Sequence, residues 1–167
     1  MRGAARAAAF AAALALAPLA HAADSATYTV RQITEDTALK AAQAALASCR
    51  RSGYQVAVAI VDRSGLAQVV LRDRFAGAHT IEVSTDKAWT AASTRTSTAE
   101  IQRITAPAEK MSGLRNVPRI VALAGGLPIE AGGSVLGAIG VSGAPGGEAD
   151  EACAKAGLAA IADDLEF

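Results

Sequence analysis

His79 is the side chain of this sequence best suited to bind a metal ion, because imidazole is the commonest metal ligand among the side chains. It lies in the segment 77–80, Gly-Ala-His-Thr, where we expect a loop to lead into a helix and the ring to be accessible. His21 is the one other histidine, and it falls in an N-terminal segment that we expect to be removed. A metal site built from several histidines is therefore excluded within one mature chain. The alternative role for His79 is a local hydrogen bond at the helix terminus.

Three basic side chains lie near His79 in the sequence and are candidates to bind an anion: Arg72, Arg74 and Lys87. Guanidinium and ammonium groups bind carboxylates and phosphates through charge-assisted hydrogen bonds. The alternative for each is a solvated surface charge. Lys87 has the further alternative of an ion pair with a carboxylate such as Asp62. The sequence alone leaves these alternatives open.

Two glycine-rich stretches follow later in the chain, Gly125-Gly126 and residues 140–147. The second runs from an expected strand into an expected helix, an arrangement in which backbone N–H groups face an anion. It does not match G-x-G-x-x-G and no P-loop lysine follows it, so we expect no nucleotide site. The alternatives are close packing or a subunit contact for the longer stretch. For Gly125-Gly126 the choice lies between a tight turn and the lining of a pocket.

The remaining side chains do not form a recognisable catalytic set. A Ser-His-Asp triad would have to use His79, and the nucleophile-elbow signature G-x-S-x-G is missing from the sequence. The chain carries 16 basic and 16 acidic residues, and loss of Arg2 and Arg6 leaves a slightly acidic mature protein. A nucleic-acid partner, which requires a basic surface, is not expected. We therefore predict no catalytic residue and favour a binding protein over an enzyme.

Residues 1–22 have the pattern of a signal peptide. Arg2 and Arg6 precede an almost wholly apolar run, which ends in a small-x-small cleavage pattern at Ala22. The apolar run is too short to cross about 30 Å of hydrocarbon comfortably, so a membrane anchor is the less favoured alternative. We expect a periplasmic or secreted mature protein, residues 23–167, with the length of one domain and no membrane span.

Cys49 and Cys153 are the only cysteines of the chain. In an oxidising compartment, two thiols that meet form a disulfide. Such a bridge would close a loop of roughly 100 residues and contribute about 4 kcal/mol to stability. The alternative is two buried free thiols, and the sequence does not decide between them.

The hydrophobic periodicity and the turn residues predict an α/β (α+β) fold. Helices are expected from Thr34, the N-cap, to Gly53, from position 79 or 80, from Ser97, and at 148–163. Residues 62–65, Asp-Arg-Ser-Gly, are expected to form the turn between the first two strands. Strands are expected at 55–61, 66–71, 119–124, 127–130 and 134–141. The connections between the first two strands, and between the last three, are short enough for hairpins. We therefore expect a five-stranded antiparallel sheet with helices packed against it.

Four short motifs in this order resemble the GlcG/HbpS-like family, also called haem-degrading-domain-like. They are Val-Asp-Arg-Ser-Gly at 61–65, Lys-Ala-Trp-Thr-Ala at 87–91, Gly-Gly-Leu-Pro-Ile at 125–129 and Gly-Ala-Ile-Gly-Val-Ser-Gly at 137–143. Asp150 and Ala156-Gly157 follow in the last helix. The resemblance covers nearly the whole mature chain and extends to the C-terminal domain of PduO-type corrinoid adenosyltransferases. It implies a profilin-like α-β2-α-β3-α fold.

The resemblance also implies an exported haem (tetrapyrrole)-binding protein for sequestration, delivery or sensing, assembled as a homo-oligomer, often an octamer. His79 is the expected axial ligand of the iron, with Met111, Tyr28 and Tyr54 as secondary candidates. Arg72 and Lys87 are the expected partners of the haem propionates. The predicted cofactor-binding residues are His79, Thr80, Arg72, Lys87, Gly125 and Gly126. The alternative is an enzyme or accessory protein that acts on a small organic acid.

Overall fold

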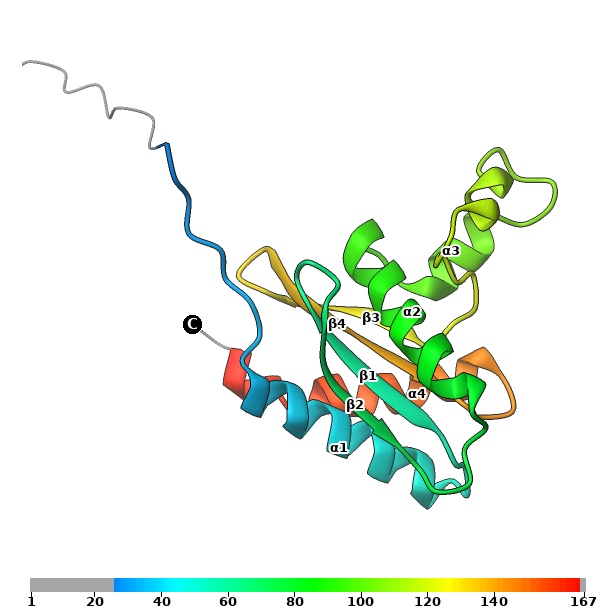
Figure 1. Cartoon of the computed structure of the whole chain (residues 1–167), viewed down its shortest axis with the longest axis horizontal. Coiled ribbons are helices and arrows are strands. Elements are labelled where there is room, and N and C mark those ends of the chain that lie inside the picture. The colour runs from blue at the N-terminus through cyan, green and yellow to red at the C-terminus, as the bar shows by residue number, and fades with distance from the viewer. Residues whose placement is uncertain (1–25, 166–167) are drawn as a thin grey trace, which may run out of the picture.

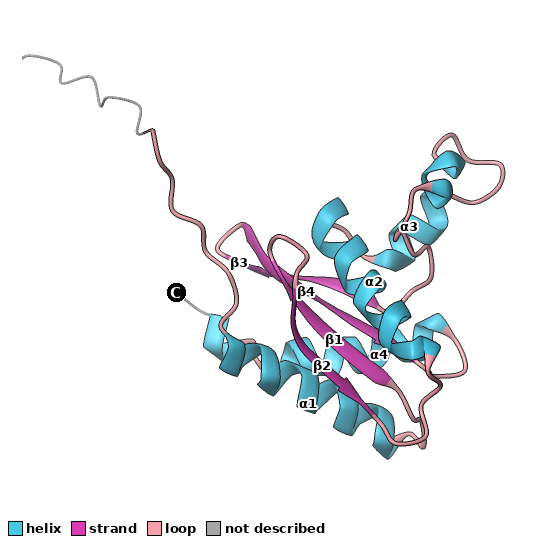
Figure 2. Ribbon diagram, viewed as in Figure 1, coloured by secondary structure: helices cyan, strands magenta, loops and turns pink. Residues whose placement is uncertain are grey.

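A four-stranded antiparallel sheet with helices on both faces forms the body of the protein (Figure 2). The computed structural model describes residues 26–165, so the predicted signal peptide at 1–22 lies outside the described residues. The elements in chain order are α1 (Glu35–Arg51), β1 (Ala57–Asp62), β2 (Ala67–Arg72), α2 (His79–Thr94), α3 (Thr98–Ile104), η1 (Ser112–Asn116), β3 (Gly126–Ala131), β4 (Ser134–Ser142), α4 (Gly147–Ala159) and η2 (Asp163–Leu165). The strand order is β2-β1-β4-β3.

The two faces of the sheet are packed differently. Helices α1 and α4 lie side by side on one face, and α2 lies on the other (Figure 1). Larger side chains such as Ile60 and Ile139 fill the core on the α1/α4 side, whereas Val61 and Ala138 pack with alanines of α2. Small residues on the α2 face let backbones approach closely. A Cβ at Gly140 would lie 2.0 Å from the carbonyl oxygen of Ser84 on α2.

Local sequence signals set the ends of α1 and the first hairpin. Thr34 is the N-cap of α1, and its side chain accepts a hydrogen bond from the Thr37 N–H, as the sequence predicted. In the turn between β1 and β2, Asp62 Oδ1 accepts hydrogen bonds from the N–H groups of Ser64 and Leu66 at 2.8 and 3.0 Å. Gly65 completes this turn with a φ of +82°, which glycine adopts without strain.

The predicted fifth strand is absent, and the segment from Arg119 to Ala124 is irregular. Arg119 has a φ of +70°, which is incompatible with a strand. The Val121 N–H donates to Thr90 Oγ1 at 3.0 Å, and the Ala124 N–H donates to Gln102 Oε1 at 3.2 Å. Because side chains of α2 and α3 satisfy these donors, the segment needs no strand partner. The mixed α/β class is confirmed, and the count of five strands is wrong.

A disulfide joins Cys49 of α1 to Cys153 of α4, across 104 positions of sequence. This answers the question that the sequence left open between a bridge and two free thiols. The two helices approach closely because their contact surface is built of small residues: a Cβ at Gly157 would lie 2.8 Å from the Ala41 carbonyl oxygen. Within residues 26–165, no helix has the length and apolarity needed to cross a membrane.

Candidate functional site

A cavity of about 660 Å³ lies where the end of α1, the first turns of α2 and the loop from β4 to α4 meet. Its volume is in the range of small-molecule sites. The lining residues come from these elements and their flanking loops: Gly53, Tyr54, Gln55, Phe75, Gly77, His79, Thr80, Val83, Lys87, Leu123, Ser142, Gly143, Ala144, Pro145, Gly146, Gly147 and Asp150. Three of the six predicted cofactor-binding residues are therefore brought together here: His79, Thr80 and Lys87.

His79 is the first residue of α2, and it is exposed at the cavity. Its ring packs against Gly77, where a Cβ would come within 2.7 Å of Cε1 and 2.9 Å of Nδ1. Thr80 is buried, and its hydroxyl donates to the Gly77 carbonyl oxygen at 2.7 Å. Thr80 thus stabilises the turn that presents the imidazole, instead of contacting a ligand through an exposed hydroxyl.

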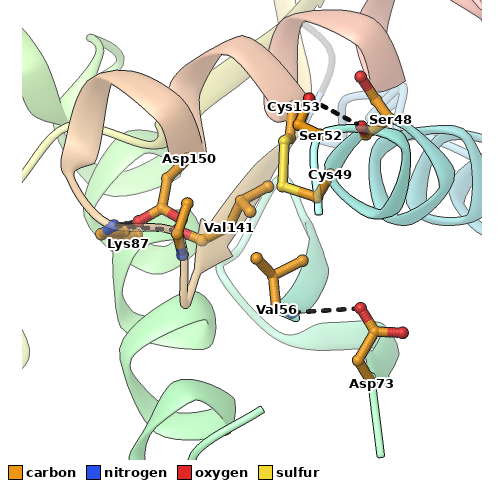
Figure 3. Close-up of a disulfide and its surroundings, with 10 residues drawn as sticks. Ser48, Cys49, Ser52, Val56, Asp73, Lys87, Val141, Asp150 and Cys153 are labelled. Atoms are coloured by element: carbon orange, nitrogen blue, oxygen red, sulfur yellow. Dashed lines mark hydrogen bonds and ion pairs between the residues drawn. A yellow bond between two sulfur atoms is a disulfide. The ribbon is translucent and has the colours of Figure 1, made fainter. Parts of the chain in front are cut away.

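Lys87 lies two turns further along α2, at the buried end of the cavity. Its ammonium donates to Asp150 Oδ2 of α4 at 2.7 Å and to the Val141 carbonyl oxygen of β4 at 2.9 Å. Figure 3 shows these groups close to the disulfide. The partner of Lys87 is therefore Asp150, and not Asp62, which is the last residue of β1.

Asp150 connects this ion pair to the loop that lines the cavity. Its Oδ1 accepts a hydrogen bond from the Ala144 N–H at 2.9 Å, while Oδ2 binds Lys87. Burial raises the pKa of Asp150 above its ordinary value, and the hydrogen bond and charge of Lys87 and the Ala144 N–H oppose that effect. The residue was noticed in the sequence only as part of a family motif. Its role was missed because it lies 63 positions from Lys87.

The other three predicted residues do not line the cavity. Arg72 is exposed, and its guanidinium donates to the carbonyl oxygens of Ala76 and Arg74 at 2.5 and 3.3 Å. Gly125 and Gly126 are buried against α2. A Cβ at Gly125 would lie 2.9 Å from Lys87 Nζ, so the glycine leaves room for the ammonium group.

An apolar rim is the feature of the site that the sequence analysis missed. Phe75 is 80% exposed and Leu123 is 53% exposed, and both line the cavity. Large apolar side chains in contact with water beside a cavity are typical of ligand sites. Among the secondary candidates for an iron ligand, Tyr54 lines the cavity, whereas Tyr28 and Met111 do not. The described residues contain no group of three or more His, Cys, Asp or Glu side chains placed to hold a metal ion.

Comparison with known proteins gives a consistent family relationship. The family model described as "Haem degrading protein HbpS-like" matches residues 33–159. A 15.0 kDa protein from the dhaT-dhaS intergenic region of Citrobacter freundii, described as uncharacterised, is 36% identical over 116 residues. The match covers 68% of this chain and 82% of that relative.

Three solved structures share the fold over most of their length. Protein ORFY of Klebsiella pneumoniae is 30% identical with a TM-score of 0.79, and the match covers 83% of this chain and 96% of that one. A double mutant of Streptomyces reticuli HbpS is 38% identical with a TM-score of 0.76, over 88% and 98% of the two chains. The complex of PduOC with haem is 28% identical with a TM-score of 0.74, over 78% and 95%.

Proposed function

Because this chain belongs to the HbpS-like family, whose model spans residues 33–159, we propose that it binds haem in the cavity beside His79. The single observation that carries the proposal is the exposed imidazole at the mouth of a cavity with an apolar rim. His79 would hold the iron of a haem through its imidazole, and haem would supply iron-based ligand binding at this site. The complex of the similar protein PduOC with haem supports the same ligand class.

The residues around the cavity suit the two chemistries of a haem molecule. The apolar side chains of Phe75, Val83 and Leu123 match the porphyrin face and its apolar substituents. The start of α4 suits a propionate, because Gly146 and Gly147 line the cavity and no side chain caps that helix. Lys87 at the buried end is already paired with Asp150, so a propionate there would depend on the backbone N–H groups of α4 and not on this ammonium group.

The test of this proposal is a hemin titration followed by absorbance in the Soret region. Wild-type protein should bind hemin at micromolar concentration with a shifted Soret band, and His79→Ala should change the band and weaken binding at least tenfold. Gln43→Ala, an exposed position on α1, is the matched control and should titrate like the wild type. If hemin keeps the Soret band of free hemin when wild-type protein is added, the proposal is contradicted.

Export and assembly belong to the same proposal. We propose that the mature protein is periplasmic or secreted and acts in haem sequestration, delivery or sensing as a homo-oligomer. The disulfide supports an oxidising compartment. N-terminal sequencing of protein recovered outside the cytoplasm should give a chain that starts at or near Ala23. Light scattering of that protein should give the mass of an assembly, and a monomer would contradict this part.

A small organic acid is a second candidate ligand, favoured by the uncapped start of α4 at the cavity. Backbone N–H groups at a helix N-terminus bind carboxylates without any need for haem. A panel of small carboxylates should then raise the melting temperature of the protein by several degrees while hemin has no effect. Stabilisation by hemin alone would rule out this candidate.

A further inference from the structure

Two walls of the cavity come from distant parts of the sequence and touch each other. The first wall, residues 53–55, follows α1, and the second wall, residues 143–147, leads into α4. A Cβ at Gly143 would lie 2.6 Å from the Gln55 carbonyl oxygen and 2.9 Å from Val56 Cα. The shape of the cavity therefore depends on how α1 and α4 are held relative to each other.

Each wall is hydrogen-bonded to a residue that is a half-cystine or lies within one helical turn of one. Cys49 accepts through its carbonyl oxygen a hydrogen bond from the Tyr54 N–H at 3.0 Å, which fixes the first wall to the end of α1. Cys153 lies three positions after Asp150, whose carboxylate holds the Ala144 N–H of the second wall. Figure 3 shows the disulfide between these two helices, beside the Lys87–Asp150 pair. The covalent bond thus joins the end of α1 to the middle of α4, about one turn beyond Asp150.

The other contacts between α1 and α4 are weaker. The helices meet through small residues such as Ala41, Ala45 and Gly157, which bury little apolar area per side chain. The ion pair between Lys40 and Asp164 connects the start of α1 to η2, and both side chains are well exposed. Exposed pairs of this kind contribute little to stability. The disulfide is therefore the strongest single link between α1 and α4 near the cavity.

We infer that the Cys49–Cys153 disulfide positions the two walls of the cavity, so that haem affinity depends on the oxidation of these thiols. The inference rests on the proposed function for its ligand. Both cysteines are thiols in a reducing cytoplasm, and there the walls are held only by the weaker contacts. Exchange with a protein disulfide of the outer compartment forms the S–S bond: the two thiols lose two protons and two electrons, and the oxidant's disulfide is reduced to two thiols. The protein then takes up haem after export and not before it.

The experiment compares the wild type with the double variant Cys49→Ala/Cys153→Ala. Hydrogen exchange should rise selectively in residues 53–55 and 143–150 of the variant, and hemin affinity should fall at least tenfold. Leu136→Ala is the control for a general loss of stability, because Leu136 is buried at the other end of β4. This control should keep hemin affinity within twofold and should not raise exchange selectively in the two walls. Reduced wild-type protein provides a second exchange measurement should the double variant not fold.

The two readouts separate the inference from the proposed function. If the wild type binds no hemin, the proposed function fails, and selective exchange in the two walls still decides the positioning role. If the wild type binds hemin and the variant binds it equally well with unchanged exchange, the inference is overturned and the proposed function stands. Exchange that rises evenly along the chain, as a general loss of stability would produce, also overturns it.

Discussion

Lys87 Nζ of α2 lies 2.7 Å from Asp150 Oδ2 of α4, and the two side chains are only 2% and 6% exposed. The same ammonium donates to the Val141 carbonyl oxygen, and the same carboxylate accepts from the Ala144 N–H. The pair therefore joins a helix from each face of the sheet to the loop that lines the cavity. Burying an ion pair costs desolvation free energy, so we expect the pair to act mainly by fixing the positions of the elements that it joins.

The first prediction removes the cation from this pair. Lys87→Met leaves the Asp150 carboxylate buried without its partner, and we expect a loss of about 3–5 kcal/mol in the free energy of unfolding at neutral pH. Adding Asp150→Asn removes the uncompensated charge and keeps an oxygen acceptor for the Ala144 N–H. The double variant should recover most of the lost stability in urea denaturation. Equal instability of the single and double variants would show that the methionine packs badly, and that charge is not the cause.

The second prediction concerns pH. Burial raises the pKa of Asp150, so the folded protein binds this proton more tightly than the unfolded chain does. This proton contributes its full stabilisation below the pKa of Asp150 in the unfolded chain, about 3.9. The stabilisation is lost as the pH rises through the higher pKa of Asp150 in the folded protein. The free energy of unfolding of the wild type should therefore fall relative to that of Asp150→Asn across this window. Denaturation curves at stepped pH test this, and parallel pH profiles would contradict it.

The elements that the sequence predicted correctly are those with local causes. The N-cap at Thr34 and the turn at Asp62 depend on side chains within four positions of the groups they bind. The strand predicted at 119–124 is wrong, although the apolar pattern of this segment is typical of a strand. Thr90 and Gln102, in helices about 20 to 30 positions earlier, accept hydrogen bonds from its backbone N–H groups. No local pattern encodes such long-range side-chain contacts.

The same limit applies to the candidate site. The sequence identified His79 from its residue type, and Lys87 from its place near His79 and in a family motif, and both line the cavity. It did not identify Asp150, because a carboxylate in a closing helix looks like any solvated acid until the fold places it against Lys87. The exposed Phe75 and Leu123 were missed for a related reason: apolar residues in loops have no periodicity that marks a rim.

The third prediction tests the close packing of β4 against α2. A Cβ at Gly140 would lie 2.0 Å from the Ser84 carbonyl oxygen and 2.6 Å from the Ala88 N. These are backbone atoms of the helix that carries the cavity residues, so α2 would have to move. Gly140→Ala should lower the free energy of unfolding by about 1–3 kcal/mol or more. The matched control is Gly113→Ala, where a Cβ meets nothing within 4 Å, and it should change stability by less than about 0.5 kcal/mol.

The last prediction separates the position of the imidazole from its presence. A Cβ at Gly77 would lie 2.7 Å from His79 Cε1, and the ring is the end of an exposed side chain that can turn away. Gly77→Ala should therefore change stability by less than about 0.5 kcal/mol, because the clash is relieved without moving backbone. If His79 binds the iron, the displaced ring should alter the Soret band and weaken hemin binding, in the direction of His79→Ala but less strongly. Gly113→Ala serves again as the control. A Gly77→Ala protein with the wild-type spectrum and affinity would show that the iron does not depend on this orientation of the ring.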